Sequence, residues 1–219
     1  MRTVAVLPIK TFSRAKHRLA DAVGGQERRA LAEAMAADVL YALGGVPGLD
    51  GVVVVTAERR AAAAAREAGA EVVHDDREAG QSVAATFGVD AAIRLGAERA
   101  LLVPGDCPAL DPRELGELLA RPGSPAVVIV PDRHGSGTNA LLLEPPRAIE
   151  PSFGPGSFAR HAARARAAGV PAKVAELPSL GLDVDTPGDL EALRAALSAR
   201  EGGAERTRAV IARLLAPAA

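Results

Sequence analysis

Short runs of β-branched residues alternate along this chain with longer, alanine-rich amphipathic stretches, and this alternation limits the fold more than any other feature. It is typical of βα units that build a mainly parallel sheet with helices on both faces, because strands buried on both sides are continuously apolar. The predicted strands are residues 3–8, 51–56, 70–74, 99–104, 126–131, 139–144 and 172–177. The predicted helices are residues 27–44, 57–68, 81–95, 112–120, 156–168 and 187–199. We therefore expect an α/β, Rossmann-like fold with a mainly parallel mixed sheet.

The length and apolar content of the chain suit a single domain. Of the 219 residues, 48% are hydrophobic, which is enough to bury one generous core. We expect this domain to cover residues 1–200, with a C-terminal helical extension over 201–219 after a Gly-Gly break. The extension carries four apolar residues at helical spacing, Val210, Ile211, Leu214 and Leu215. They would pack on the domain or in a homodimer.

The composition argues against several classes of protein. The 26 Lys and Arg residues are balanced by 27 Asp and Glu, so there is no basic excess for nucleic-acid binding. Aromatic residues make up 2% of the chain, which leaves little for base stacking. The single cysteine, Cys107, excludes an internal disulfide and a zinc cluster, and no 18-residue apolar run is present. We expect a cytoplasmic protein with no nucleic-acid or membrane partner.

Asp106 is the first candidate site residue. It follows the predicted strand 99–104 in "LLVPGDCPAL", and ligands of open α/β sheets collect beyond the carboxyl ends of strands. The alternative is that Asp106 caps the next helix, but Asp111, with Glu114 three residues later, is the better predicted cap as a capping box. Asp106 is then free to bind a divalent cation such as Mg²⁺.

A second acidic pair lies in "GLDVDTPGDL". Asp183 and Asp185 are two residues apart in an extended run, so their side chains emerge on one face and repel each other unless a cation lies nearby. Thr186 or Asp185 could instead cap the following helix, with Pro187 in its first turn. The "DVDTP" segment also resembles the aspartyl-phosphate motif of haloacid-dehalogenase phosphatases, in which Asp183 would be the nucleophile. That motif normally follows the first strand of its fold, whereas here it lies near the end of the chain.

Positive charge gathers after the first predicted strand. The segment "PIKTFSRAKHRLA" brings together Lys10, Arg14, Lys16 and Arg18, and it contains no Walker or dinucleotide-binding motif. A solvated basic loop is one interpretation. A phosphate cradle is the one we favour, because nucleotide phosphates usually lie after the first strand of doubly wound folds.

Five segments in this order resemble the guanylyltransferases of coenzyme F-420 biosynthesis, which act on 2-phospho-L-lactate or phosphoenolpyruvate. They are "LPIKTFSRAKHRLA", "PGDCPAL", "GSGTNALLL", "SFGPGSFARH" and "LDVDTPGDL". The resemblance implies a single-domain nucleotidyltransferase that couples GTP to a small phosphorylated three-carbon acid with release of pyrophosphate. It also implies Mg²⁺ as cofactor and a deazaflavin transferase as the next enzyme to receive the product.

The resemblance also implies roles for particular residues. Three carboxylates would bind Mg²⁺, namely Asp106, Asp183 and Asp185. Lys10, Lys16 and Asp106 would take part in catalysis, and Thr138, Gly154 and Ser157 would bind the acceptor acid. Arg14 belongs to the basic loop and is assigned to the nucleotide, together with Gly80, Gln81 and Ser82, which replace a Gly-Leu-Asn segment common in relatives. His161 is expected to be a packed or solvated residue, and Cys107 a small apolar spacer.

The sequence is also compatible with other functions. Another nucleotidyltransferase of this fold could act on a molybdopterin or a sugar phosphate, although the "GGxSxRMGxxK" signature of the cofactor relatives is absent after the first strand. A phosphatase or a regulatory domain without turnover is a more distant alternative. Phosphoenolpyruvate, 2-phospho-L-lactate and 3-phospho-D-glycerate differ only around one carbon. The Ala- and Arg-rich composition suggests a GC-rich genome, and bacterial members of the family that the chain resembles tend toward phosphoenolpyruvate. We therefore expect phosphoenolpyruvate as the acceptor.

Overall fold

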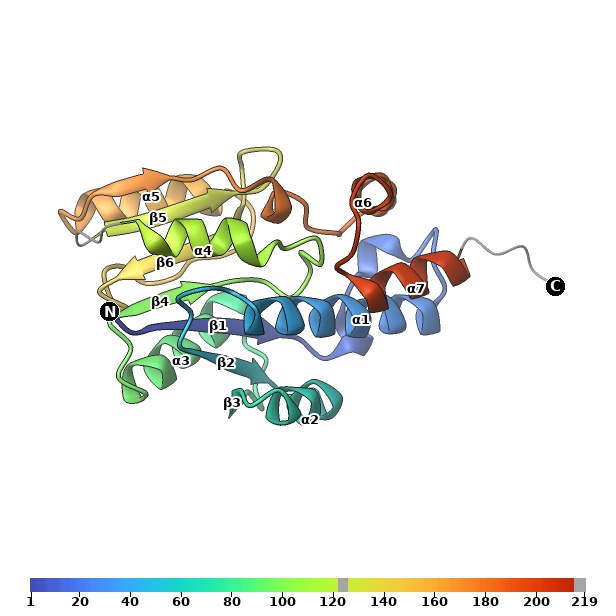
Figure 1. The fold of residues 1–219 in the computed structure, drawn as a ribbon, viewed down its shortest axis with the longest axis horizontal. Helices are drawn as coiled ribbons and strands as arrows, with labels where there is room; N and C mark the ends of the chain where they lie inside the picture. Colours follow the sequence, from blue (N-terminus) through green and yellow to red (C-terminus); the bar gives the residue numbers. More distant parts are fainter. Residues whose placement is uncertain (122–125, 215–219) are drawn as a thin grey trace.

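A seven-stranded mixed sheet forms the centre of the protein, as the computed structural model shows for residues 1–121 and 126–214 (Figure 1). The strands are β1 (Thr3–Ile9), β2 (Gly51–Thr56), β3 (Glu71–His74), β4 (Arg99–Leu102), β5 (Ala126–Pro131), β6 (Thr138–Glu144) and β7 (Ala172–Val174). Their order is β3-β2-β1-β4-β6-β5-β7, and β6 runs antiparallel to its neighbours β4 and β5. The predicted mainly parallel mixed sheet is confirmed.

The helices also follow the sequence pattern. They are α1 (Gly25–Gly44), α2 (Arg59–Glu67), α3 (Gln81–Arg94), α4 (Pro112–Ala120), α5 (Ser157–Ala167), α6 (Pro187–Ser198) and α7 (Glu205–Leu214), with short 3-10 turns η1 (Phe12–Arg14), η2 (His17–Leu19) and η3 (Pro178–Leu180). Two predicted strands end early. The strand expected over 99–104 ends at Leu102, since Pro104 has no N–H for the ladder, and the one expected over 172–177 ends at Val174, ahead of Pro178.

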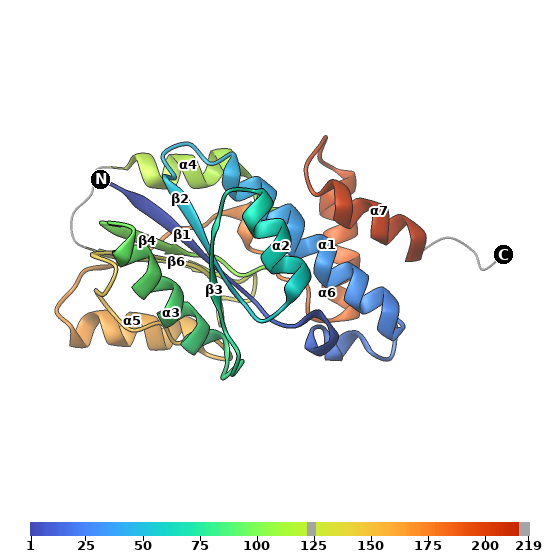
Figure 2. The same cartoon turned by 90° about the horizontal axis from the view of Figure 1, so that it is seen from below.

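Helices cover both faces of the sheet. One apolar cluster joins α1, α2 and α4 to one face, and a second joins α3 and α5 to the other (Figure 2). The approach of α3 to the sheet is close enough to require glycine, because a Cβ on Gly88 would lie 2.1 Å from Cγ1 of Val6. The alternation of apolar runs in the sequence thus produces a three-layered α/β arrangement.

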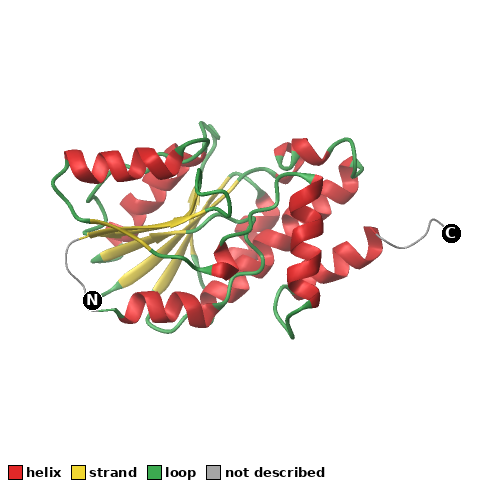
Figure 3. Cartoon of the chain, turned by 90° about the horizontal axis from the view of Figure 1, so that it is seen from above, coloured by secondary structure: helices red, strands yellow, loops and turns green. Residues whose placement is uncertain are grey.

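A helical lobe extends beyond one end of the sheet (Figure 3). It is formed by η2, part of α1, α6 and α7 around a third apolar cluster that includes Val184, Val210 and Ile211. Asp38 on α1 is buried and accepts hydrogen bonds from the backbone N–H groups of Arg206 and Thr207, at 3.3 and 2.7 Å. A side chain of α1 therefore caps the first turn of α7. The predicted apolar face packs within the chain at Val210 and Ile211, while Leu215 lies outside the described residues.

Two predicted helix caps have different outcomes. Thr186 caps α6 in a reciprocal capping box with Asp189, as one of the two sequence interpretations predicted. The capping box predicted for Asp111 and Glu114 is wrong in its second half. Asp111 does accept from the N–H of Arg113 at 2.9 Å, but Glu114 instead accepts from the N–H of Ser179 at 3.1 Å. No helix in the described ranges is long and apolar enough to cross a membrane.

Candidate active site

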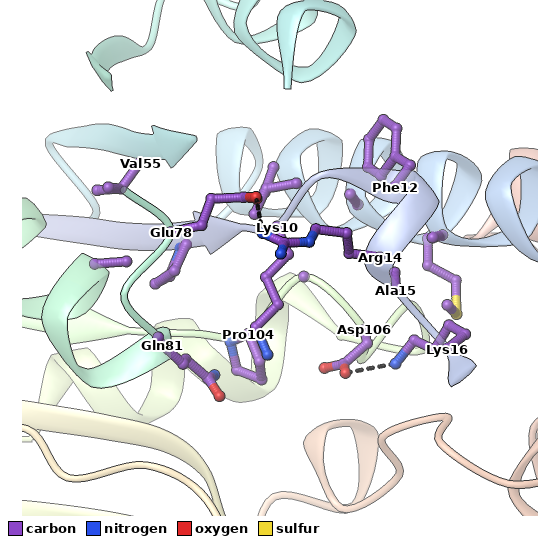
Figure 4. Close-up of a pocket in the computed structure, with 18 of the residues that line it drawn as sticks. Lys10, Phe12, Arg14, Ala15, Lys16, Val55, Glu78, Gln81, Pro104 and Asp106 are labelled. Carbon is purple, nitrogen blue, oxygen red and sulfur yellow. Dashed lines mark hydrogen bonds and ion pairs between the residues drawn. The ribbon is translucent and has the colours of Figure 1, made fainter. Parts of the chain in front are cut away.

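The candidate site is a cavity of about 440 Å³ beyond the carboxyl ends of β1, β2 and β4 (Figure 4). Its walls come from the end of β1 and the loop 10–17 after it, the segment 75–81 after β3, and residues 104–106 after β4. The loop after β1 leads through α1 to β2 on one side, whereas the loop after the neighbouring β4 leads through α4 to β5 on the other side, so a crevice opens between the two loops. This is the position at which open α/β sheets bind ligands.

Lys16 is the central charge of this cavity. Its ammonium donates to Oδ2 of Asp106 at 2.7 Å (Figure 4). It also donates to Oδ1 of Asp185 at 3.1 Å, and only 6% of the Lys16 side chain is exposed. Burial opposes the charge, but the two carboxylates raise the pKa of Lys16 above its ordinary value. The Lys16 backbone has a φ of 59°, in the left-handed region that a non-glycine residue rarely adopts. The fold thus holds a protonated lysine between two of the predicted metal ligands.

Asp183 lies next to Asp106 and Asp185 and is hydrogen-bonded to the start of β6. Asn139 donates from its amide to Oδ1 of Asp183 at 3.2 Å and to the carbonyl of Leu180 at 2.8 Å. The neighbouring Val184 is fully buried, and its N–H donates to the carbonyl of Asp106 at 3.3 Å. The alternation of burial places both Asp183 and Asp185 on the side opposite Val184, as the sequence predicted.

The oxygen donors of this site fit Mg²⁺. Burial and the nearby Asp106 carboxylate raise the pKa of Asp183, so the carboxylates are close enough to repel one another and a cation would relieve that repulsion. In the part of the chain that the structure describes, no three acidic, His or Cys side chains form a complete ligand set. Lys16 lies between Asp106 and Asp185 instead. Mg²⁺ commonly uses one or two protein carboxylates and completes its shell with substrate phosphates and water, so an incomplete protein ligand set suits it.

Glu78 forms the opposite wall and binds the basic loop. It accepts from the N–H of Thr11 at 2.7 Å and from the Arg14 guanidinium at 3.0 Å. Burial opposes the shift, but the Thr11 N–H and then Arg14 lower the pKa of Glu78. Asp75 in turn accepts from the N–H of Glu78 at 3.1 Å. The predicted phosphate cradle is therefore fixed by an acidic segment that sequence analysis did not single out.

The residues predicted to contact the nucleotide separate into two groups. Arg14, Gly80 and Gln81 line the cavity, as do Lys10 and Lys16. Ser82 does not line it, and its hydroxyl accepts from the N–H of Phe153 at 2.9 Å. Ser82 therefore joins α3 to the loop that was predicted to bind the acceptor.

The residues predicted to bind the acceptor lie together around the start of β6 and of α5. Since β6 is antiparallel to β4, its first residue, Thr138, lies at the same edge of the sheet as the carboxyl end of β4. Ser157 begins α5 and is buried, and its N–H donates to the carbonyl of Gly154 at 3.0 Å. Thr138 directly precedes Asn139, the partner of Asp183. The predicted acceptor residues are thus linked to the predicted metal ligands.

Arg160 and His161 organise the loop 152–155. The Arg160 guanidinium donates to the Ser152 hydroxyl and to the carbonyls of residues 152–155. His161 is completely buried, so it is packed rather than solvated. It also forms hydrogen bonds with Thr138 and Ser152, which the sequence analysis did not predict. Cys107 is buried as well, and burial raises the pKa of its thiol well above the usual value. A protonated, inaccessible thiol agrees with the predicted role of spacer.

Comparison with known proteins identifies relatives of this chain. A family model described as "Guanylyl transferase CofC like" matches residues 3–198. A protein of Conexibacter woesei named phosphoenolpyruvate guanylyltransferase is 51% identical over 217 residues, covering 98% of this chain and 97% of its own. A protein of the same name from Sphaerobacter thermophilus is 39% identical over 193 residues, covering 88% and 93%.

A solved structure shares the fold. A nucleotidyl transferase from Methanothermobacter thermautotroptrophicus superimposes with a TM-score of 0.64 at 20% identity, over 91% of this chain and 99% of its own. The predicted nucleotidyltransferase fold is thereby confirmed.

Proposed function

The chain belongs to the CofC-like guanylyl transferase family, and we propose that it is a Mg²⁺-dependent enzyme that couples GTP to phosphoenolpyruvate. As a member of this family it is a nucleotidyltransferase. The observation that carries the proposal is the cavity in which Lys16 lies within hydrogen-bonding distance of Asp106 and Asp185, beside Asp183. This arrangement suits a reaction between anions. The names of the two relatives favour phosphoenolpyruvate over 2-phospho-L-lactate and 3-phospho-D-glycerate as the acceptor.

The proposed reaction is a displacement at the α-phosphorus of GTP. A phosphate oxygen of phosphoenolpyruvate attacks that phosphorus and forms a new P–O bond, and the bond to the oxygen bridging the α- and β-phosphates breaks. Its electron pair stays with the departing pyrophosphate, and the other product is enolpyruvoyl-2-diphospho-5'-guanosine. The nucleophile is already an anion, so no general base is needed. Catalysis consists of positioning and charge neutralisation.

The residues of the cavity divide this work. Lys16 neutralises charge on the nucleotide phosphates, and Lys10 and Arg14 extend the positive wall along the leaving pyrophosphate. Asp106, Asp183 and Asp185 would hold Mg²⁺, which when bound supplies charge neutralisation at the α-phosphate and the leaving group. Thr138, Gly154 and Ser157 would bind the acceptor acid. Gly80 and Gln81 would contact the nucleoside, and Ser82 would act through the 152–157 loop.

The product defines the next step. A guanosine-diphospho adduct is an activated phospho-acid, and the enzyme proposed to use it is the deazaflavin transferase of coenzyme F-420 biosynthesis.

A protein with one buried cysteine also suits a reducing compartment, so we place the reaction in the cytoplasm. A phosphatase or a regulatory domain finds no support, because the family match extends over residues 3–198.

The test is pyrophosphate release from GTP and Mg²⁺ with each of the three phosphorylated acids. We expect release with phosphoenolpyruvate, and formation of the guanosine adduct by mass spectrometry. Asp106→Ala and Asp183→Ala are expected to abolish release while the circular dichroism spectrum stays that of the wild type. Full activity in both variants would refute the metal assignment. Binding of GTP without release with any acceptor would refute the proposed reaction.

A further inference from the structure

His161 is a completely buried histidine with a partner on each ring nitrogen. Its Nε2 accepts from the backbone N–H of Ser152 at 2.8 Å, and its Nδ1 lies 3.0 Å from Oγ1 of Thr138. These contacts connect α5, the loop before it and the first residue of β6. The reaction described above gives His161 no role of its own.

The tautomer of the His161 ring follows from its partners. A backbone N–H can only donate, so Nε2 must carry the lone pair rather than the proton. Burial, with the nearby charges of Arg164 and then Arg160, lowers the pKa of His161 to about 4, so the ring is neutral at pH 7. A neutral ring without a proton on Nε2 carries it on Nδ1. His161 therefore donates to Thr138, and Thr138 accepts.

This polarity leaves the hydroxyl proton of Thr138 unused. No other hydrogen-bond partner of that hydroxyl lies within residues 1–121 and 126–214. A carboxylate or phosphate oxygen can only accept, so an anionic acceptor acid requires a hydroxyl whose proton is free. The opposite tautomer would make Thr138 donate to the ring and present a lone pair to the anion.

His161 also fixes the loop on the other side of the acceptor. The Phe153 ring meets the His161 ring edge-on, with centroids 5.3 Å apart at 74°. The same loop contains Gly154, whose φ of 103° no other residue type adopts readily. Through Ser152 and Phe153, the imidazole sets the position of the loop relative to Thr138.

We propose that His161 is a positioning residue for the acceptor: its Nδ1–H orients the Thr138 hydroxyl so that the hydroxyl proton faces the substrate anion, while its Nε2 anchors the 152–157 loop. The inference rests on the proposed function, since the acceptor acid is the ligand concerned. In this proposal His161 does not touch the substrate, but it sets the hydrogen-bond direction of the Thr138 hydroxyl, which does.

Two substitutions separate the two hydrogen bonds. In His161→Gln the amide oxygen can replace Nε2 as acceptor for Ser152, but the donor to Thr138 is lost. In His161→Asn the amide nitrogen can replace Nδ1 as donor to Thr138, but the acceptor for Ser152 is lost. We expect H161Q to raise the KM for the acceptor about tenfold to a hundredfold, with the KM for GTP within about twofold of wild type. H161N is expected to recover part of that loss.

A double-mutant cycle tests whether His161 acts through Thr138. Thr138→Val removes the hydroxyl, so adding H161Q to it is expected to raise the KM for the acceptor no further. Additive effects, or a parallel rise in both KM values with a lowered melting temperature, would show a merely structural role. An unchanged KM in H161Q would overturn the inference directly.

A measurement without turnover covers the case in which the variants do not fold. Long-range ¹H–¹⁵N correlation spectra of the wild-type protein report which imidazole nitrogen is protonated, and we expect Nδ1 for His161. A proton on Nε2 would overturn the inference. Wild-type protein inactive with all three acids would instead refute the proposed function, and an active wild type with an unaffected H161Q would refute only the role of His161.

Discussion

Replacing Lys16 by methionine removes the ammonium between Asp106 and Asp185 and keeps a side chain of similar length. In the wild type that ammonium makes two charge-assisted hydrogen bonds, at 2.7 and 3.1 Å. Without it, Asp106 and Asp183 have no ion-pair partner within the described residues, and Asp185 keeps only the exposed Arg18 guanidinium at 3.8 Å. We expect the variant to be less stable in the absence of metal and to bind Mg²⁺ more tightly in the absence of nucleotide, since Lys16 and Mg²⁺ would compete for the same oxygens.

The size of the effect depends on how far water screens the two carboxylates. A hydrogen bond to a charged group contributes about 1.5–3 kcal/mol when buried, and an exposed ion pair contributes about 0–1 kcal/mol. The Lys16 side chain is 6% exposed, but Asp106 is 29% and Asp185 is 44% exposed, so the low end applies. We expect K16M to lose about 1–2 kcal/mol of unfolding free energy, or roughly 2–8 °C in melting temperature for a chain of this size.

The assay is chemical unfolding followed by circular dichroism, because the chain has no tryptophan and one tyrosine. Unfolding is measured in chelator and again with Mg²⁺, which is expected to restore K16M more than it stabilises the wild type. Lys10→Met is the matched control. Lys10 lines the same cavity, is exposed, and makes no ion pair within the described residues. K16M is also expected to lose roughly a hundredfold to a thousandfold in kcat, as when one stabilising donor is removed.

Two results would refute this reasoning. If K16M and K10M had the same free energy of unfolding in chelator, the ion pairs of Lys16 would not stabilise the fold. If Mg²⁺ stabilised K16M no more than the wild type, the lysine and the metal would not compete for the carboxylates.

Three further changes test the packing and electrostatics around the site. Gly88→Ala is expected to cost about 1–3 kcal/mol of unfolding free energy, because its Cβ would overlap Val6, whereas Gly44→Ala, with nothing within 4 Å, should cost none. Asp38→Ala should cost about 1–3 kcal/mol by uncapping α7, measured by urea unfolding. Asp38→Asn should cost a similar amount, because its amide oxygen can accept from only one of the two N–H groups and its amide nitrogen would face the other. The unfolded state takes up a proton on His161 near pH 6.5, but the native state does so only near pH 4, so stability should fall as pH falls between these values. Unfolding at pH 7 and 5 should differ by about 2 kcal/mol more in wild type than in H161Q, and equal differences would contradict the buried neutral ring.

The local pattern of the sequence was sufficient for the elements and for the candidates at their ends. Apolar runs and helical spacing predicted each strand and α-helix of residues 1–121 and 126–214, though not the short 3-10 turns, because side-chain periodicity reports the local backbone geometry directly. On the same basis Asp106, just past a strand, could be assigned to the edge of the sheet, and Asp183 and Asp185, two residues apart, to one face of an extended segment. The local capping rule failed where a distant backbone N–H competed for the same carboxylate. Glu114 binds the N–H of Ser179 rather than completing a capping box.

Which charges meet could not be deduced from the sequence. Lys16 lies 90 residues from Asp106 and 169 from Asp185, and their contact requires β1 to lie beside β4. Glu78 reaches Thr11 across 67 residues only because the loops after β1 and β3 leave the same edge of the sheet. Sequence analysis thus named three carboxylates and the lysines of the site from residue type and local position, but not Glu78 or Asp75. The tertiary structure alone decided that one lysine lies between two of those carboxylates and that a buried histidine donates to Thr138, since hydrogen bonds between distant segments depend on strand order and packing rather than on local periodicity.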